Sequence, residues 1–148
     1  MSIFLRTVNV EEAIRVAKGI APHPGREEVP LEEAAGRVLA EAVSADVDIP
    51  AFDRSVVDGY ALRASDTIGA GESIPSLLTL LGTVRMGQAP DLVMRAGECA
   101  YIPTGGALPP GADAVVMIEH TEIIDDQVLV KRPVAPGENL IMRGEDFA

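Results

Sequence analysis

The sequence predicts an α+β fold that is mainly β, with helices at the N-terminus and then a small β-rich domain, either a barrel or a coiled sheet. Three observations support this prediction. Apolar residues recur at helical spacing near the N-terminus, and from about residue 45 the apolar runs become short and are separated by Gly, Pro, Asp and Asn. The chain also has 14 Gly and 11 Pro among 148 residues, which favours many turns over long helices.

The first predicted helix begins after Asn9 and ends near Gly19. Asn9 is a good N-cap, and Glu12 follows three residues later, as in a capping box. Glycine is a common residue at a helix C-terminus. One face of this helix is apolar, because four side chains fall at positions i, i+3, i+4 and i+7: Val10, Ala13, Ile14 and Ala17.

A second, shorter helix is predicted after Pro30, following a Pro-rich loop at residues 21–30 in which His23 is expected to be solvated. Glu32 and Glu33 stand in its first turn, where the helix dipole favours negative charge. Gly36 weakens this helix. Its apolar residues again have helical spacing: Leu31, Ala34, Ala35 and Val38.

The strands are predicted after residue 45, with the pair Asp125–Asp126 as a hairpin turn. The candidate strands are residues 60–64, 76–84, 92–96, 99–102, 113–119 and 127–132. Strands at this spacing are typical of a small all-β domain. The change from helical spacing to short apolar runs near residue 45 predicts a β-rich domain over residues 47–135, and a helical or linker domain made of residues 1–46 and 136–148.

Composition excludes several functions. The formal net charge is −11, and no basic stripe is present for nucleic acid or for an anionic membrane surface. Carboxylates suit a hard cation such as Mg²⁺ instead. The single cysteine, Cys99, lies in an apolar run and is expected to be a buried, inert thiol in a reducing cytoplasm. We expect no signal peptide and no membrane span.

The most informative segment is residues 48–66, DIPAFDRSVVDGYALRASD. Pro50 stiffens its entry, and it places Asp53, Ser55 and Asp58 close together, followed by Gly59. Two interpretations of Asp58 stay open. Taken alone, the pair Asp58–Gly59 favours a tight hairpin turn, and a ligand- or metal-binding role for Asp58 is the alternative.

A second segment, YIPTGGALPPGADAVVMIEH at residues 101–120, contains Thr104, Gly105 and Gly106 after an apolar strand. Glycine pairs let backbone N–H groups face an anion, and a Thr hydroxyl can donate to an oxygen. A plain turn is the alternative. A third segment, Arg-Gly-Glu-Asp, ends on Asp146, which is a candidate site residue. The alternative interpretation is that Asp146 is only a solvated surface charge. His120 beside Glu119 could suggest a metal site, but no second His or Cys is near it in sequence.

Taken in order, these segments resemble the molybdopterin molybdenumtransferase family, known as MoeA in bacteria and as the E domain of gephyrin. The resemblance begins with VPLEEAAGRVLAEAV, continues through PAFDRSVVDGYALRASD and PTGGALPPGADAVVMIEHTE, and ends with GED. Departures are local. Val56 and Val57 replace the usual Ala-Met, Pro103 replaces a common Met, and Met86 stands where Ala-Gly is usual.

The resemblance implies an elongated linker domain and a β-rich second domain, with a catalytic α/β domain and a C-terminal β domain absent from this chain. It implies an enzyme that inserts molybdate into adenylylated molybdopterin, depends on Mg²⁺ and releases AMP. Homodimers and other molybdenum cofactor biosynthesis enzymes are its implied partners. By matching motifs, Asp58, Thr104 and Asp146 lie near the catalytic cleft, with Asp58 as the candidate Mg²⁺ ligand, and their loops are shaped by the neighbouring Ser55, Gly59 and Gly105.

An alternative of another class is a non-catalytic dimerisation or binding module with the same fold, because fold does not fix function. A downstream α/β domain in the complete reading frame favours the enzyme, and a stop codon after Ala148 favours the module. On either interpretation this chain alone is expected to be inactive, since its charge of −11 should repel molybdate.

Overall fold

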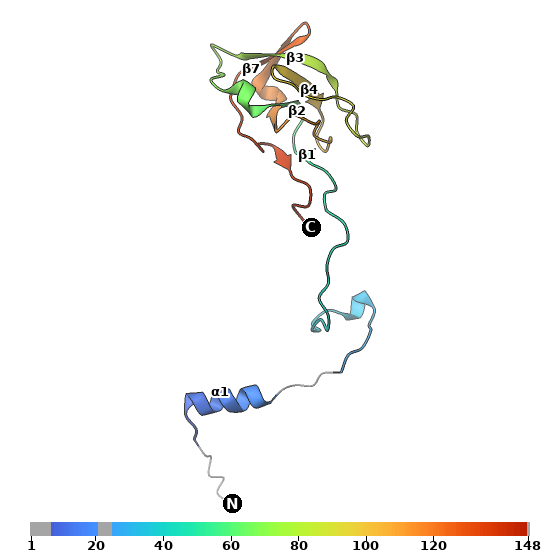
Figure 1. The fold of residues 1–148 in the computed structure, drawn as a ribbon, viewed down its shortest axis with the longest axis vertical. Coiled ribbons are helices and arrows are strands. Elements are labelled where there is room, and N and C mark those ends of the chain that lie inside the picture. The colour runs from blue at the N-terminus through green and yellow to red at the C-terminus, as the bar shows by residue number, and fades with distance from the viewer. Residues whose placement is uncertain (1–6, 21–24, 148) are drawn as a thin grey trace, which may run out of the picture. The chain divides into compact units, whose positions relative to one another are not determined.

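The computed structural model describes residues 7–20 and 25–147, in two units that divide between Val43 and Ser44. The first unit contains the helix α1, Val10–Gly19, and the 3₁₀ turn η1, Leu31–Glu33. The second unit contains the strands, which form a curled sheet (Figure 1). The fold is therefore mainly β. His23, expected to be a solvated loop residue, lies outside the described residues.

Helix α1 forms as its sequence predicts. The side chain of Asn9 accepts a hydrogen bond from the backbone N–H of Glu12 at 2.7 Å, which satisfies one of the free donors of the first turn. None of its residues is buried, so the apolar face that carries Val10 and Ile14 is exposed within this unit. Neither α1 nor any other helix in the described part of the chain has the length and apolar character needed to cross a membrane.

The prediction of a second helix after Pro30 is wrong. Only a single 3₁₀ turn forms at Leu31–Glu33, and the chain leaves it before Val38, which is 95% exposed. Gly36 adopts a φ of +79°, a left-handed conformation that ends a helix. The apolar residues with helical spacing span too few turns to maintain a helix through this glycine.

The second unit is built on a six-stranded sheet with the order β5-β2-β4-β3-β7-β6. All neighbours are antiparallel except β3 and β4, which run parallel. A small ladder, β1-β8, lies beside it. The strands are β1 Arg54–Ser55, β2 Gly59–Leu62, β3 Ser76–Thr83, β4 Glu98–Ile102, β5 Ala114–Met117, β6 Thr121–Ile124, β7 Gln127–Val130 and β8 Leu140–Ile141, with the 3₁₀ turns η2 Ala64–Thr67 and η3 Ile118–His120 between them.

The core is aliphatic and lies on both faces of the central strands. All four residues of β2 are buried. One face contributes Tyr60 and Leu62 to a cluster with Val116 and Val128, and the other contributes Ala61 to a cluster with Ile102. Burial on both faces explains why β2 and β5 read as continuous apolar runs instead of alternating patterns.

The predicted strands are mostly confirmed, and the exceptions have physical causes. Residues 92–96 form no strand, because Met94 is buried against another loop and donates its N–H to the Pro110 carbonyl at 2.8 Å. Strand β6 was not predicted as a separate element. The turn at Asp125–Asp126 is confirmed and joins β6 to β7, with Asp125 at a φ of +55°.

The C-terminal segment folds with the sheet unit, whereas the sequence placed residues 136–148 with the N-terminal domain. It pairs with residues 49–56: Ile49 opposes Phe147, and the ladder continues to Ser55 opposite Leu140. Strands β1 and β8 were not predicted, because two-residue strands carry no readable periodicity. The boundary in the structure therefore lies after Val43, with the return segment on the sheet side.

Close packing of backbone against backbone fixes Gly59 at the start of β2. A Cβ atom at this position would lie 2.1 Å from the carbonyl oxygen of Val116 and 2.8 Å from Cγ1 of Val115. No side chain can enter this space unless β5 moves away from β2.

We therefore predict that Gly59→Ala lowers the free energy of unfolding by about 3 kcal/mol or more, since β2 and β5 must separate. Gly71→Ala is the matched control, because nothing lies within 4 Å of its Cβ position and its φ is not positive. It should stay within about 0.5 kcal/mol of the parent chain in urea unfolding. Equal effects of the two substitutions would contradict this account.

Cys99 on β4 is fully buried, and burial raises the pKa of its thiol from 9.0 to about 12. It is the buried thiol that the sequence predicts. Above pH 9 the unfolded chain loses this proton while the native chain keeps it, so the free energy of unfolding falls as pH rises towards 12, with a slope of at most about 1.4 kcal/mol per pH unit.

Cys99→Ala should remove this part of the alkaline slope, although the smaller side chain also lowers stability at every pH. Urea unfolding of both proteins between about pH 8.5 and pH 10.5 measures the difference. The two curves of unfolding free energy against pH should converge as pH rises. Curves that stay parallel would show that the thiol does not titrate differently in the two states.

Candidate functional site

Strand β1 lies between two segments that are distant in sequence. On one side, the Ser55 N–H donates to the Gly106 carbonyl at 3.0 Å, and the Gly105 N–H donates to the Ser55 carbonyl at 2.8 Å. On the other side, β1 pairs with β8, and the Val56 N–H donates to the Asn139 carbonyl at 3.0 Å. Residues 54–56 thus join the Thr-Gly-Gly loop to the C-terminal segment.

The side chain of Ser55 shapes the turn that leads to Asp58. Ser55 is 1% exposed, and its hydroxyl donates to the Val57 carbonyl at 2.6 Å and accepts from the Val57 N–H at 3.2 Å. The Asp58 carbonyl then accepts the Ile118 N–H at 3.2 Å. The backbone on both sides of the Asp58 side chain is therefore fixed.

Asp58 and Thr104 meet across 46 residues of sequence. One carboxylate oxygen of Asp58, Oδ1, accepts the backbone N–H of Thr104 at 2.8 Å and its hydroxyl at 3.1 Å. Both residues are exposed to solvent. The hairpin interpretation of Asp58–Gly59 is excluded, because Gly59 is the first residue of β2, and β2 pairs with β4 and β5 and not with the preceding strand β1.

The Thr-Gly-Gly segment is a tight turn, as the plain interpretation predicts, and it also holds Asp58. The Gly106 N–H donates to the Pro103 carbonyl at 2.8 Å, and Gly105 adopts a φ of +81° at the third position. A left-handed residue at this position is typical of a type II turn, and it favours glycine. The turn presents the Thr104 N–H and hydroxyl on the same side, towards Asp58.

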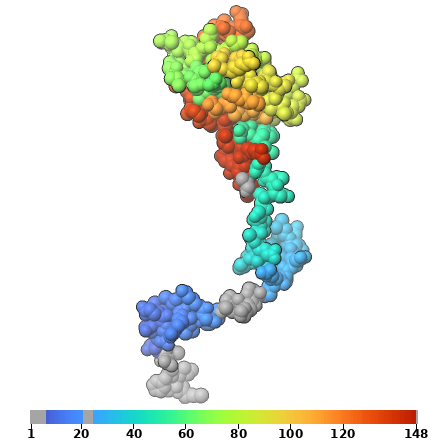
Figure 2. Space-filling view, viewed as in Figure 1, coloured from blue at the N-terminus to red at the C-terminus, as the bar shows by residue number. Residues whose placement is uncertain are grey.

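A cavity of about 310 Å³ adjoins this turn. Part of its wall comes from the loop between β3 and β4, which projects from the sheet unit (Figure 2). Its walls are mostly apolar, and Gln88 contributes the single polar side chain. The lining residues are Phe52, Gly87, Gln88, Ala89, Pro90, Gly105 and Ala107. Because Gly105 follows Thr104 directly, the hydrogen-bonding pair and the apolar wall lie next to each other. Ligand sites in proteins are commonly lined in this way, by mostly apolar surface with a small number of polar groups.

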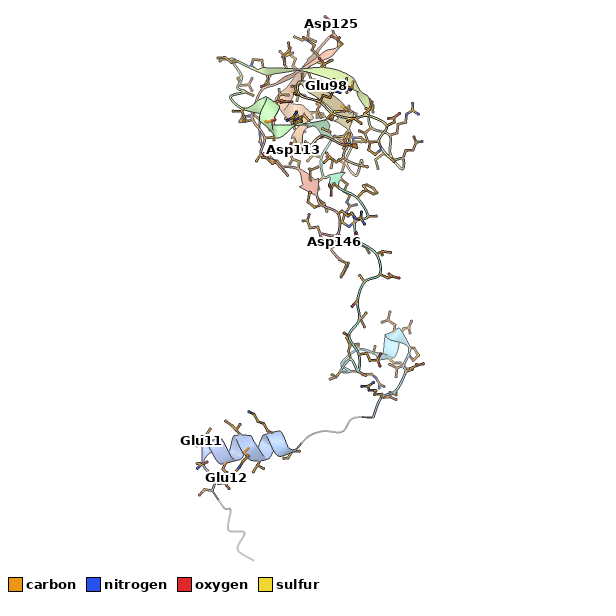
Figure 3. All side chains as sticks on the ribbon, viewed as in Figure 1. Glu11, Glu12, Glu98, Asp113, Asp125 and Asp146 are labelled. Carbon is orange, nitrogen blue, oxygen red and sulfur yellow. The ribbon has the colours of Figure 1, made fainter. Side chains whose placement is uncertain are left out.

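Asp146 lies apart from this pair. Its backbone N–H donates to the Ile49 carbonyl at 2.9 Å, at the end of the ladder that is opposite to Ser55. Its side chain is exposed to solvent, on the C-terminal segment (Figure 3). The preceding Glu145 turns back and accepts the Met142 N–H at 2.8 Å. Within this chain, Asp146 therefore does not join the contact between Asp58 and Thr104.

The described residues do not form a complete metal-binding site. Within the residues that the structure describes, no group of three or more His, Cys, Asp or Glu side chains is placed to hold a metal ion. Asp58 is a single carboxylate, one oxygen of which already accepts two hydrogen bonds. The carboxylates of this chain therefore do not form a Mg²⁺ cage by themselves.

Comparison with known proteins identifies the family. Residues 8–148 match the family model described as the MoeA N-terminal region, domains I and II. The chain belongs to the MoeA family. This confirms the resemblance drawn from the motifs, and the whole matched segment is the N-terminal region of that family.

Two relatives and one solved structure illustrate the match. The chain is 38% identical over 120 residues to molybdopterin molybdenumtransferase 2 of Mycobacterium tuberculosis, covering 81% of this chain and 30% of that protein. It is 36% identical over 143 residues to molybdopterin molybdenumtransferase of Bacillus subtilis strain 168, covering 94% and 33%. The molybdopterin biosynthesis MoeA protein of Pyrococcus horikoshii OT3 superposes with a TM-score of 0.77 at 46% identity, covering 82% and 32%.

The chain thus spans about a third of the length of these MoeA relatives. The motif residues Asp58 and Thr104 fall inside the matched region, as do Ser55, Gly59 and Gly105. Two features of the site were missed by sequence reasoning. Phe52 was visible as an aromatic residue two positions after Pro50 in the first motif, whereas nothing in the sequence of the loop Gly87–Pro90 linked it to Thr104.

Proposed function

We propose that this chain supplies one wall of the active site of a molybdopterin molybdenumtransferase, in which Asp58 and Thr104 contact the substrate. One observation carries the proposal: two motifs separated by 46 residues form an exposed, charge-assisted contact beside an apolar cavity. A contact needed only for stability would more often be buried, because exposed ion pairs and hydrogen bonds contribute little to folding.

The chemistry of the pair suits substrate positioning. Two donors from Thr104 hold the Asp58 carboxylate in one orientation, so little freedom is lost when a ligand binds. The Thr104 hydroxyl donates a hydrogen bond to Asp58, and its oxygen can still accept a hydrogen bond from a ligand. Phe52 and Pro90 line the adjoining cavity and offer apolar surface for a ring system. We assign Ser55, Gly59 and Gly105 to the loops that hold this pair, and Asp146 to a separate contact with the substrate or with another domain.

The substrate class follows from the relatives, which are named molybdopterin molybdenumtransferases. We propose a role in molybdenum cofactor biosynthesis, with molybdate and adenylylated molybdopterin as substrates and AMP as a product. Dependence on Mg²⁺ is part of this proposal. The ligand chemistry of Asp58 also limits this part of the proposal. A single carboxylate holds Mg²⁺ only when substrate phosphates and groups beyond the described residues, 7–20 and 25–147, complete the coordination shell.

The net charge of −11 supports a division of labour between domains. Molybdate and phosphates are anions and need a positive environment, which this chain does not offer. We therefore propose that the α/β domain of the whole protein binds them, and that this chain alone does not bind molybdate. A homodimer and contacts with other cofactor-synthesis enzymes remain our proposal for the whole protein. The exposed apolar face of α1 supports the existence of such contacts.

The single free cysteine supports a reducing, cytoplasmic location, and the acidic charge favours neither nucleic acid nor an anionic membrane as a partner. The alternative function, a non-catalytic dimerisation or binding module, would use the same fold without turnover. It predicts that the Asp58–Thr104 contact serves folding only.

Asp58→Asn in the full-length protein distinguishes these two functions. The amide keeps the size of the side chain and one oxygen acceptor for Thr104, so the melting temperature should change by less than about 3 °C. Loss of the charge should lower the rate of molybdenum insertion about a hundredfold or more, as expected for a group that stabilises the transition state. Turnover and thermal melting are measured on the same preparations.

Asp66→Asn is a suitable control, because Asp66 also accepts a backbone N–H, from Gly97 at 2.8 Å, but takes no part in the contact between Asp58 and Thr104. It should leave turnover within about twofold of the parent enzyme. If Asp58→Asn retains normal turnover while stability falls, Asp58 is a structural residue, and the binding module becomes the better proposal.

A further inference from the structure

Asn139 makes hydrogen bonds both to the six-stranded sheet and to the segment that carries the proposed site. Its backbone adopts a φ of +61°, a left-handed conformation that among non-glycine residues Asn tolerates best. Its side-chain amide donates to the Val115 carbonyl on β5 at 2.8 Å, and its own carbonyl accepts the Val56 N–H at 3.0 Å. The side chain thus holds β5 while the backbone holds the residue next to Ser55.

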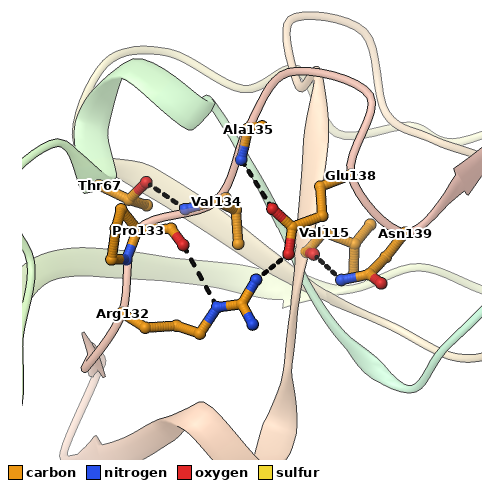
Figure 4. A network of polar contacts seen from close by, with 8 residues as sticks. All are labelled: Thr67, Val115, Arg132, Pro133, Val134, Ala135, Glu138 and Asn139. Atoms are coloured by element: carbon orange, nitrogen blue, oxygen red, sulfur yellow. Dashed lines mark hydrogen bonds and ion pairs between the residues drawn. The ribbon is translucent and has the colours of Figure 1, made fainter.

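The loop before Asn139 is fixed by its own polar contacts (Figure 4). Arg132 forms an ion pair with Glu138, whose second carboxylate oxygen accepts the Ala135 N–H at 2.8 Å. The Glu138 carbonyl accepts the Val115 N–H at 3.1 Å. Residues 138 and 139 therefore satisfy both backbone groups of Val115 on the outer edge of β5, and Asn139 cannot shift without breaking this pairing.

A short series of contacts leads from Asn139 to the candidate site. Val56, held by Asn139, follows Ser55, whose backbone N–H and carbonyl bond to Gly106 and Gly105. Gly105 follows Thr104, and Thr104 contacts Asp58, two residues after Val56. The same four-residue stretch, 55–58, is thus attached to the Thr104 turn at both of its ends and to Asn139 in between.

We propose that Asn139 is a positioning residue for the Asp58–Thr104 pair, acting through Val56 and Ser55. The assignment rests on the proposed function insofar as the pair contacts the substrate. The positioning itself is a property of this chain. Two features of Asn139 are needed together: the left-handed backbone, which directs its carbonyl to Val56, and the side-chain donor, which fixes it to Val115.

Amide hydrogen exchange of the 148-residue chain, followed by NMR, tests the positioning directly. Asn139→Asp removes the donor to Val115 and keeps the side-chain size, and Asn139→Gly keeps access to the left-handed backbone without a side chain. Both should speed the exchange of the Val56, Thr104 and Gly105 amides roughly tenfold, the loss expected for one net hydrogen bond. Amides of the central strand β4 should change much less.

Val128→Ala is the matched control, because it truncates a fully buried side chain on β7, outside this series of contacts. It should speed exchange across the whole sheet unit, with no preference for Thr104 and Gly105. If Asn139→Asp and Asn139→Gly give the same uniform pattern as the control, Asn139 is a general stability residue and the proposal is overturned.

Turnover of the full-length Asn139→Asp protein separates this proposal from the proposed function. Selective exchange with turnover lowered about tenfold or more supports both. Selective exchange with normal turnover supports the positioning and contradicts the role of the Asp58–Thr104 pair in catalysis. Unselective exchange overturns the positioning whatever the turnover.

Discussion

Backbone pairing on both sides of β1 is the constraint on which the rest of this site depends. Ser55 bonds through both its N–H and its carbonyl to the Gly105–Gly106 turn, while Val56 bonds to the C-terminal segment. Three stretches far apart in sequence are thereby brought together in one small ladder. The contact between Asp58 and Thr104 follows from this arrangement, because the chain on each side of it is already fixed. The hydrogen bonds from Thr104 to the charged carboxylate then set the orientation of the Asp58 side chain.

The packing of the central sheet limits how this ladder can move. Gly59 allows β2 to approach the Val116 carbonyl more closely than any side chain would permit, and the Asp58 carbonyl bonds to Ile118 just beyond β5. Gly59, the first residue of β2, is therefore held in place, and it directly follows Asp58. The exposed carboxylate of Asp58 is thus attached to a backbone that is buried from the next residue onward, as is typical of sites built on rigid elements.

The sequence predicted much of this structure where a pattern was long or a motif was distinctive. Local chemistry was enough to predict the N-cap at Asn9, the strands with apolar runs and the turn at Asp125–Asp126. The second helix failed because Gly36 takes a left-handed φ within a short pattern. Strands β1 and β8 were not predictable, since each has two residues and its pairing is decided by contacts about 85 residues away along the chain.

The same division holds for the candidate site. Asp58, Thr104 and their glycines could be selected from the sequence, because acidic, hydroxyl and glycine residues in loops are typical of ligand contacts. Their mutual contact and the separation of Asp146 could not, because both depend on the ladder that joins residues 49–56 to the C-terminal segment. Asn139 was equally hidden: its importance lies in a backbone angle and in two partners from different strands.

A crystal structure of the full-length protein bound to adenylylated molybdopterin would test the central claim most directly. The account predicts a ligand oxygen or nitrogen within about 3.5 Å of the Asp58 carboxylate or the Thr104 hydroxyl, with the two side chains still bonded to each other. It also predicts that part of the ligand lies against Phe52 in the adjoining cavity. A ligand bound elsewhere, with Asp58 and Thr104 both facing bulk solvent, would contradict the account.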